Sequence, residues 1–536
     1  MTFTTLLLFI LLVQIVHFLG TWKLYIKAGR KAWEAAIPVY NAIVLMKIIN
    51  RSPWWTILLF VPIVNLIMFP VVWVETIRSF GKNSNLDTFL VVATFGLYIY
   101  YINYTQDVTY IKDRSLKPRT AAGEWTSSIL FAVIAATIVH TYVMQPFTIP
   151  TSSLEKTLLV GDFLFVSKFH YGARMPMTAV SFPMVHDTIP VLHKKSYLSK
   201  PQLPYFRLPG FQSIKRNDIV VFSWPTDTLI NINNPANGFK IKPLDKKSNY
   251  VKRCVAIPGD ELEIRDGYVY INGKQNELPD RARLQFRYKI ISKNSFVKTD
   301  NQGRYTSQPS AFVSDHFDIS DIYISEIDRE NKIITHIAQM TDEAYLKVKN
   351  NPNVIEVTKM TEEKGKWNPS VFPQDPRFNW NTKYFGPITL PKAGTTIDIS
   401  IENIPLYKRI IEVYEGSELG ISNKIIQNGT EVLLNGNPLT SYTFLQDYYW
   451  MMGDNRDNSQ DARMWGFVPF NHVVGKPVFV WMSYDGNAKG FNKIRTERLF
   501  TTVGGSGKPV SYFMYFIIAL AGWFAFDFYR KRKKKA

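Results

Sequence analysis

The feature that most constrains the fold of this chain is a long apolar stretch that ends abruptly in a turn rich in hydroxyl groups. Residues 126–143 are long enough, as a helix that rises about 1.5 Å per residue, to cross most of a hydrocarbon core about 30 Å thick. Two prolines follow and end the helix, and Thr151, Ser152 and Ser153 come directly after the second one. The sequence therefore predicts a membrane span over 126–146 with a hydroxyl cluster just beyond it.

Further apolar stretches lie near both ends of the chain, and four of them are predicted to span a membrane. A shorter one, 37–49, contains Pro38 and is more typical of an interfacial or re-entrant helix than of a span. The four further predicted spans cover residues 5–22, 54–74, 86–104 and 512–529. The first three of these spans and the segment 37–49 make up a predicted N-terminal membrane region at residues 1–125.

Basic residues indicate how these spans are oriented, because cytoplasmic loops are enriched in Lys and Arg. Such residues gather after the first and third predicted spans, and residues 530–535 are all Lys or Arg. Five spans of alternating direction would place residues 145–511 outside the cytoplasm and the basic C-terminal tail, 530–536, inside it. The loop after the third span carries Lys112, Arg114, Lys117 and Arg119.

The composition excludes several classes of function. The chain has 63 Lys and Arg against 44 Asp and Glu, but much of this excess lies in the predicted cytoplasmic loops and tail. We therefore expect no nucleic-acid partner. Cys254 is the only cysteine, so no intrachain disulfide can form, and no pair of histidines has the spacing of metal ligands. Neither a metal nor another cofactor is expected.

The middle of the chain is predicted to be mainly β-structure. Short runs rich in β-branched and aromatic residues alternate with turns made of Pro, Gly, Asp and Asn. The long stretch 273–444 carries no chemical motif, and we interpret it as a β-rich insertion into a smaller core at 147–272 and 445–490. Residues 491–511, which include Gly-Gly-Ser-Gly-Lys, are predicted to be a linker. Strands are expected at 217–224, 250–257, 262–272 and 473–482.

Lys252 lies within one of these predicted strands, on the same face as Tyr250 and Cys254. If that face points inward, loss of water would disfavour the ammonium group and lower the pKa of Lys252 from about 10.4 toward the range of a general base. If the strand instead lies at an edge of the sheet, Lys252 and Arg253 would both reach water. The strand's own sequence leaves both alternatives open.

The densest polar loop of the chain covers residues 452–469. A calcium-binding loop counted from Asp457 fails, because Ala462 replaces the required glycine and Val468 stands where the bidentate glutamate belongs. Asn, Asp, Ser and Gly also build tight turns through hydrogen bonds to their own backbone. The loop is therefore interpreted as a rigid scaffold that delivers one or two polar side chains.

Three segments, in this order, resemble the type I signal peptidase family. They are IPTSSLEKTL after a membrane span, YVKRCVAIPGD on a strand, and GDNRDNSQDARMWG in a loop, and KRNDIVVF at 215–222 also fits. The resemblance implies a serine endopeptidase of the bacterial cytoplasmic (inner) membrane. Such an enzyme removes signal peptides from secreted preproteins. It cleaves after small residues, at the interface between the outer face of that membrane and water. The expected fold is a multi-span α-helical membrane anchor plus a mainly-β extracytoplasmic catalytic domain with a large β-rich insertion.

The resemblance also implies a role for each candidate site residue. Ser153 would be the nucleophile and Lys252 its general base, a dyad without histidine. Thr151 and the backbone N–H of Ser153 would stabilise the oxyanion, and Ser459 would orient Lys252. The residues expected to support the site structurally are Tyr250, Arg253, Gly453, Asp454, Asn455, Asn458, Asp461 and Arg463.

Several positions depart from the usual pattern of the family. None removes the nucleophile or the base, so the departures affect the oxyanion donor and the sequence preference rather than the class of reaction. Thr151 stands where serine is common, Ser152 and Leu154 replace a small residue and methionine, Lys156 stands where proline is usual, and Ala462 replaces a second serine.

Three other functions were weighed. A Ser-His-Asp triad would need His170, or His186 with Asp187, but no G-x-S-x-G motif surrounds Ser153. A transporter would need a cluster of charges within the membrane, but Glu75 and Asp527 lie at the ends of predicted spans and His140 stands alone. The remaining alternative is a membrane-anchored binding or assembly protein on a peptidase-like scaffold. Besides preproteins, membrane lipid is an expected partner, and a partner in the export machinery is left open.

Overall fold

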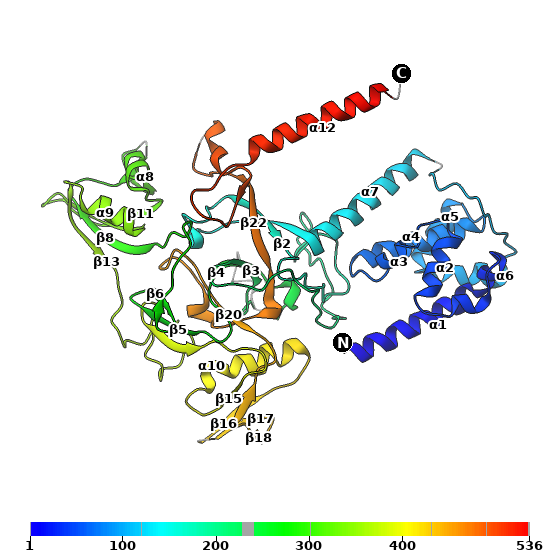
Figure 1. Ribbon diagram of the computed structural model, residues 1–536, viewed down its shortest axis with the longest axis horizontal. Coiled ribbons are helices and arrows are strands. Elements are labelled where there is room, and N and C mark those ends of the chain that lie inside the picture. The colour runs from blue at the N-terminus through cyan, green and yellow to red at the C-terminus, as the bar shows by residue number, and fades with distance from the viewer. Residues whose placement is uncertain are drawn as a thin grey trace. The chain divides into compact units, whose positions relative to one another are not determined.

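The computed structural model describes residues 2–118, 120–227, 241–300, 302–429, 431–488 and 490–533. Arg119 and the last three residues of the predicted basic tail lie outside this range. The chain divides into two compact units (Figure 1). The membrane unit comprises Met1–Met144, Ala173–Leu208 and Asp227–Lys247, and the β unit comprises Gln145–Gly172, Pro209–Thr226 and Ser248–Ala536.

The membrane unit is a bundle of mostly short helices. Only two of its described helices are long and apolar enough to cross a membrane, and these are the first and the last. The short helices between them share one apolar core with the first helix. The helices are α1 (Phe3–Lys27), α2 (Tyr40–Ile48), α3 (Trp55–Leu58), α4 (Val64–Ser79), α5 (Asn85–Ala93), α6 (Tyr98–Thr105) and α7 (Ala121–Ile138), which continues as a π-helical turn over Val139–Val143.

Two of the predicted spans are not continuous helices. The segment 54–74 is divided between α3 and α4, because Pro62 interrupts the backbone hydrogen bonds and Ile63 adopts a φ of +70°. The segment 86–104 is bent by 118° between α5 and α6, where Gly96 has a φ of +85°. This bent pair is either one broken span or a re-entrant loop. The predicted five-span topology therefore stays a prediction.

The β unit is built around an eight-stranded sheet whose order is β1-β2-β22-β3-β4-β20-β21, with β23 also paired to β22 (Figure 1). Strand β4, which carries Lys252, lies between β3 and β20 and is not an edge strand. Of the two alternatives that the sequence left open, the structure therefore has the inward one. The strands are β1 (Met144–Thr148), β2 (Asp162–Ser167), β3 (Ile219–Ser223), β4 (Asn249–Ala256), β20 (Tyr448–Met452), β21 (Val468–Pro469), β22 (Val473–Ser483) and β23 (Thr501–Thr502).

The predicted strand 262–272 is a hairpin instead of one strand. Asp266 and Gly267 both have positive φ values, and they form the tight turn between β5 (Glu261–Arg265) and β6 (Tyr268–Ile271). An Asp-Gly pair between two apolar runs is a strong hairpin signal, so this error was avoidable from the sequence. The hairpin belongs to a four-stranded sheet, β14-β5-β6-β7, with β7 at Lys274–Gln275 and β14 at Phe385–Thr389.

The predicted insertion contains helices as well as strands. One four-stranded sheet has the order β11-β12-β8-β13 and shares a core with α8 and α9. Other parts of the insertion pack in one core with the central sheet, for example Phe385 and Ile404 with Trp450. The predicted boundaries at 273 and 444 therefore do not separate two cores. The elements are β8 (Phe286–Ser292), β9 (Val297–Thr299), β10 (Tyr305–Pro309), α8 (Ala311–Phe317), β11 (Asp321–Asp328), β12 (Ile333–Met340), α9 (Asp342–Lys349), β13 (Val354–Lys359), β15 (Thr396–Asp398), α10 (Ile404–Arg409), β16 (Ile425–Asn428), β17 (Glu431–Leu434), β18 (Asn437–Pro438) and β19 (Ser441–Thr443).

The segment 491–511, predicted to be a linker, contacts the sheet. Within it, β23 pairs with β22, and the guanidinium of Arg498 pairs with the buried carboxylate of Asp162 at 2.5 Å. The Gly-rich composition of the segment gives no sign of these contacts, because their partners are distant in the sequence. The chain then enters α12 (Phe513–Lys533), the third described helix that is long and apolar enough to cross a membrane.

Candidate active site

Ser153 lies in a single helical turn, Ser152–Leu154, and its residue is only 8% exposed. The turn is held by the polar loop that follows β20. The backbone N–H of Asn455 donates to the carbonyl oxygen of Ser153 at 3.0 Å, and the Asn455 side chain donates to the carbonyl of Ser152 at 3.2 Å. Asn458 donates to the hydroxyl of Ser152 at 2.9 Å. Asn455 thus holds the backbone of the hydroxyl turn, and Asn458 holds the side chain of Ser152.

Gly453 lies where this turn meets Ser459. A Cβ atom on Gly453 would lie 2.6 Å from the carbonyl oxygen of Ser153 and 2.2 Å from the hydroxyl oxygen of Ser459. Both distances are far below van der Waals contact, so only glycine fits at this position. Ser459 is therefore adjacent to the Ser153 turn, and its buried hydroxyl has no hydrogen-bond partner among the described residues.

Lys252 is 2% exposed and lies on β4 opposite Val220. Burial lowers the pKa of Lys252 to about 8; Asp461 opposes this shift, Arg463 adds to it, and Asp454 opposes it. The amine nitrogen is 5.7 Å from the centre of the Tyr250 ring, which in turn packs edge-on against Trp465. The environment therefore favours a lysine that is neutral for a large part of the time at mildly alkaline pH.

Two buried ion pairs support this lysine from the same loop. Arg253 binds Asp454 through two hydrogen bonds of 2.7 and 2.6 Å, and Arg463 binds Asp461 through two of 2.9 and 2.8 Å. Burial acts to raise the pKa of each carboxyl group, but its arginine and its hydrogen bonds lower that pKa further, so both remain ionised. Asp461 also accepts the backbone N–H of Gly453 at 3.1 Å.

Asp454 connects the two candidate catalytic segments. One of its carboxylate oxygens accepts from Arg253, the neighbour of Lys252 on β4, and the other accepts from both Arg253 and the hydroxyl of Thr157. Thr157 lies in the segment of Ser153, and its hydrogen bond is 2.7 Å long. The serine turn, the lysine strand and the polar loop, which are far apart in sequence, therefore meet at one buried carboxylate.

Comparison with known proteins agrees with this assembly. The family described as signal peptidase, peptidase S26, matches residues 122–320 and 399–482, which together make up more than half of the chain. The chain belongs to this family. The resemblance drawn from three sequence motifs is thereby confirmed, and the protein is a hydrolase of the serine peptidase class. With its apolar helices, it is a membrane-bound peptidase with a mainly-β domain.

Similar curated proteins carry the same description. Signal peptidase I of Buchnera aphidicola subsp. Acyrthosiphon pisum (strain APS) is 24% identical over 66% of this chain and 73% of its own length. Signal peptidase I of Helicobacter pylori (strain ATCC 700392 / 26695) is 26% identical over 72% of this chain and 94% of its own length. The corresponding protein of Rickettsia canadensis (strain McKiel) is 30% identical over 30% of this chain and 46% of its own length.

Two regions of the chain are not matched by the peptidase family. Residues 33–113 of the membrane unit match a family whose function is unknown. Residues 321–398 lie in the gap between the two segments that match the peptidase family. This gap is narrower than the predicted insertion at 273–444, so parts of that insertion belong to the family pattern.

The other candidate residues from the sequence, Thr151, His170 and His186, lie outside the network of contacts described above. Thr151 is exposed, and its side chain makes no capping hydrogen bond to the Ser152–Leu154 turn. The ring of His170 contacts the hydroxyl of Ser167 at 2.5 Å, and in the part of the chain that the structure describes no hydrogen bond joins it to Ser153. His186 contacts the carbonyl of Lys247 at 3.0 Å in the membrane unit.

Lys156 explains one departure from the family pattern. Its φ is +70°, a conformation that the ring of proline cannot adopt. Its side chain pairs with Asp318 at 2.7 Å. At this position the backbone therefore has a conformation that excludes the usual proline. The lysine that replaces it also contacts the region that follows α8.

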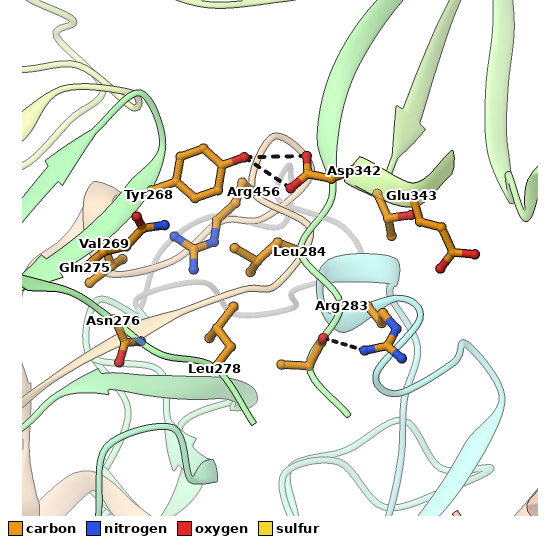
Figure 2. Close-up of a pocket in the computed structure, with 12 residues that line it drawn as sticks. Tyr268, Val269, Gln275, Asn276, Leu278, Arg283, Leu284, Asp342, Glu343 and Arg456 are labelled. Atoms are coloured by element: carbon orange, nitrogen blue, oxygen red, sulfur yellow. Dashed lines mark hydrogen bonds between the residues drawn. The ribbon is translucent and has the colours of Figure 1, made fainter. Parts of the chain in front are cut away.

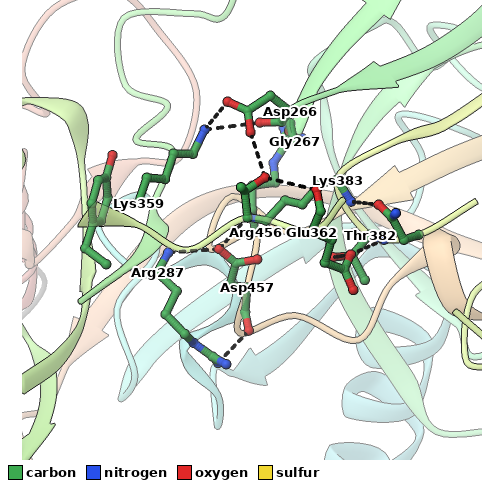
Figure 3. A network of polar contacts seen from close by, with 12 residues as sticks. Asp266, Gly267, Arg287, Lys359, Glu362, Thr382, Lys383, Arg456 and Asp457 are labelled. Atoms are coloured by element: carbon green, nitrogen blue, oxygen red, sulfur yellow. Dashed lines mark hydrogen bonds and ion pairs between the residues drawn. The ribbon is translucent and has the colours of Figure 1, made fainter. Parts of the chain in front are cut away.

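Sequence reasoning missed the residues that bind the polar loop on the side away from the serine turn and β4. Figure 3 shows that Asp457 is bound from two sides: Lys383 donates to its carboxylate at 2.7 Å, and Arg287 donates its backbone N–H at 2.8 Å. Arg456 donates to the carbonyl of Gly267 at 3.1 Å. The N–H of Gln285 donates to the carbonyl of Asp454 at 3.0 Å. Lys383, Arg287 and Gln285 come from the predicted insertion, and Gly267 comes from the β5–β6 hairpin; no motif marks the three residues of the insertion.

Two pockets border the same loop. One, of about 350 Å³, lies between the β5–β6 hairpin and the start of α9, and the guanidinium of Arg456 reaches into it between Gln275 and Leu284 (Figure 2). The other, of about 600 Å³, is lined mainly by apolar side chains around Trp465 and Trp224, with Gln460 of the polar loop at its wall. The second pocket thus adjoins the aromatic cluster that contacts Lys252.

Proposed function

We propose that this peptidase removes N-terminal signal peptides from exported preproteins through a dyad of Ser153 and Lys252. The observation that carries the proposal is the buried amine of Lys252, on a central strand that Asp454 links to the serine turn. A serine hydroxyl needs a neighbouring base to become a nucleophile, and a neutral lysine in a desolvated site can act as that base.

The chemistry proceeds in two steps. The hydroxyl oxygen of Ser153 attacks the scissile carbonyl carbon while its proton passes to the Lys252 amine. The tetrahedral intermediate then collapses, the C–N bond breaks, and the Lys252 ammonium returns the proton to the leaving amine, which leaves an ester on Ser153. Water attacks that ester with Lys252 again as the base, the C–O bond to Ser153 breaks, and the Lys252 ammonium returns the proton to the serine oxygen as the signal peptide is released. Ser459, adjacent to the turn, orients the lysine amine in both steps.

The oxyanion of the intermediate lies against the backbone N–H of Ser153 and the hydroxyl of Thr151. A donor of this kind contributes about 10² to 10³ in rate. Because the Thr151 side chain is exposed and makes no hydrogen bond within the turn, it is available for this contact. The extra methyl group of threonine beside the oxyanion makes this donor more crowded than a serine.

The substrate is a membrane-inserted preprotein cleaved after small residues, and the β unit lies on the extracytoplasmic side. In support, only the strand β1 and a short loop separate the end of the apolar helix at Val143 from Ser153. A signal peptide has the complementary form, an apolar helix followed by an extended segment with small residues at the membrane surface. Membrane lipid is the second partner of the enzyme.

Cleavage of a preprotein in detergent tests this function. The wild type, Ser153→Ala and Lys252→Met are compared, and the new N-terminus of the product is sequenced. We expect cleavage after a small-x-small site by the wild type, loss of cleavage in both variants, and unchanged folding by circular dichroism. A folded wild type that cuts no preprotein favours the binding-scaffold alternative, and a Lys252→Met variant that still cuts assigns the base to another residue.

A further inference from the structure

Arg281 binds the Gly-rich segment that precedes the C-terminal membrane helix. All three guanidinium nitrogens donate to this segment. One terminal nitrogen donates to the carbonyl of Thr502 at 2.9 Å, to its hydroxyl at 3.1 Å and to the carbonyl of Gly504 at 2.7 Å. The other two nitrogens reach the carbonyls of Gly507 at 3.0 Å, Ser506 at 3.3 Å and Lys508 at 3.5 Å.

The backbone of this segment is shaped around the arginine. Gly505 has a φ of +127°, and a Cβ atom there would lie 3.1 Å from a terminal nitrogen of Arg281. The neighbouring carboxylate of Asp280 accepts the backbone N–H of Gly507 at 3.0 Å. A Gly-rich segment is flexible on its own, but a planar group with five N–H donors can hold several carbonyls at once. We call Arg281 and residues 502–508 the Arg281 clamp.

The clamp lies where α12 joins the sheet. Strand β23 pairs with β22, Thr501 bridges Ser511, and the N–H of Tyr512 donates to the carbonyl of Phe500 at 2.9 Å. The Phe500 ring lies 4.7 Å from the ring of Phe516 on α12 and 5.6 Å from that of Phe479 on β22, centre to centre. The first turn of α12 therefore contacts the sheet through the ring of Phe500.

Phe500 reaches this position at a conformational cost. Its φ is +52°, a region that bulky side chains rarely occupy. Its ring contacts those of Phe479 on β22 and of Phe513 and Phe516 on α12. Strand β22 also pairs with β2, which follows the serine turn in the chain. One sheet thus joins the C-terminal helix to the candidate nucleophile.

From this arrangement we propose that the Arg281 clamp is a positioning device for membrane-embedded substrate. It fixes the C-terminal membrane helix on the catalytic sheet, so that the lipid bilayer around α12 determines the height and orientation at which Ser153 meets a signal peptide. The inference rests on the proposed function. A flexible tether would only keep the enzyme near the membrane, whereas a clamped helix orients it, and orientation changes the rate of a reaction between two anchored partners.

The test compares two substrates with the full-length enzyme in vesicles of phosphatidylethanolamine and phosphatidylglycerol. One is a preprotein inserted through its signal peptide, and the other is a soluble peptide that spans the same cleavage site. For Arg281→Ala we expect kcat/KM to fall about tenfold on the inserted preprotein. On the soluble peptide we expect kcat/KM to stay within about twofold of the wild type, because the site itself is intact.

Arg283→Ala is the matched control. Arg283 lies two residues away, and among the described residues its guanidinium donates to the carbonyls of Asp280 and Ala282 in its own turn and to no others. Arg283→Ala should leave kcat/KM unchanged on both the inserted preprotein and the soluble peptide. Should Arg281→Ala fold poorly, Gly505→Ala disturbs the clamp from the loop side, since a Cβ there crowds the guanidinium, and the same selective loss is expected.

The outcomes separate the inference from the proposed function. Equal losses on both substrates would reduce Arg281 to a structural residue, and unchanged rates on both would remove any role of the clamp; either result overturns the inference. If the wild type cleaves neither substrate, the proposed function itself fails. A spin label on α12 and another on β2 supply a second measurement, because releasing the clamp should broaden the distance distribution between them in Arg281→Ala but not in Arg283→Ala.

Discussion

Two buried lysines border the polar loop of this peptidase, one on each side, and their partners differ. Lys252 and Lys383 are each 2% exposed, and burial lowers the pKa of both. Lys383 pairs with Asp457 at 2.7 Å, whereas in the described part of the chain no carboxylate forms an ion pair with Lys252. Asp454 and Asp461, the acids near Lys252, are instead bound by arginines.

The comparison shows what separates a structural lysine from a candidate base. Burial alone does not, since both amines have lost their water. The Asp457 carboxylate acts to raise the pKa of Lys383 against the effect of burial, whereas the acids near Lys252 are bound by arginines and, among the described residues, none forms an ion pair with its amine. We therefore infer that the side of the loop that faces β4 is the reactive side and that the side that faces the predicted insertion is a support. Four predictions test this division.

The largest effect is expected on the β4 side, from Asp454→Ala. This change leaves the Arg253 guanidinium buried without a partner and removes the acceptor of Thr157, and it should cost about 3 to 5 kcal/mol of unfolding free energy. Denaturant unfolding of the full-length protein in detergent measures the loss. The double variant Arg253→Met, Asp454→Leu should recover part of it, because it removes the unpaired charge. A loss below about 1 kcal/mol would mean that the pair is not buried in solution.

The next effect concerns pH. Only neutral Lys252 can accept the serine proton, and with a pKa of about 8 its neutral fraction falls as the pH drops below that value. We expect kcat/KM to rise about tenfold per pH unit below 8 and to level off above it, so that the value at pH 6 is about a hundredfold below the plateau.

Initial-rate measurements on a soluble peptide between pH 5.5 and 9.5 would show this profile. Lys383→Met is the matched control, since its amine is equally buried but paired, and it should leave the midpoint where it is. A midpoint that moves with Lys383, or a profile that is flat down to pH 6, contradicts the assignment of the two lysines.

On the insertion side the same Lys383→Met variant should have a moderate effect on stability. It removes one charged hydrogen bond from Asp457, which keeps the N–H of Arg287, so a loss of about 1 to 3 kcal/mol is expected. Thermal unfolding in detergent gives this value. Catalysis at the pH plateau should change little, and a loss of activity larger than the loss of folded protein would place Lys383 on the reactive side.

The smallest effect is expected at a third lysine, Lys156. Its pair with Asp318 is partly exposed, and its positive φ is strained, so Lys156→Gly exchanges a weak ion pair for a relaxed backbone and should alter stability by less than about 1 kcal/mol. Lys156→Pro cannot adopt this φ and should destabilise by more than that. Melting temperatures of the two variants decide the point: a tolerated proline would refute the observed backbone.

Sequence reasoning succeeded where the information is local. The alternation of residues in 250–257 predicted the strand β4. It failed where continuity or distant partners decide the outcome. Mean hydropathy over 86–104 contains no sign of the bend between α5 and α6, and nothing around Lys383 indicates that Asp457 lies beside it. The Asp-Gly turn in 262–272 was present in the sequence but was read through as one strand.

The contacts that join the serine turn to the polar loop also determine when this enzyme can first act. Thr157 and Asp454 are 297 positions apart in the chain, and the contacts of Asn455 and Asn458 with Ser152 span 303 and 306. Contacts of such long range form only after the intervening chain has been made, and they form late in folding. A growing chain that already carries Ser153 and Lys252 therefore lacks the assembled candidate site until the polar loop 452–469, which also supplies Ser459 and Arg463, has been synthesised.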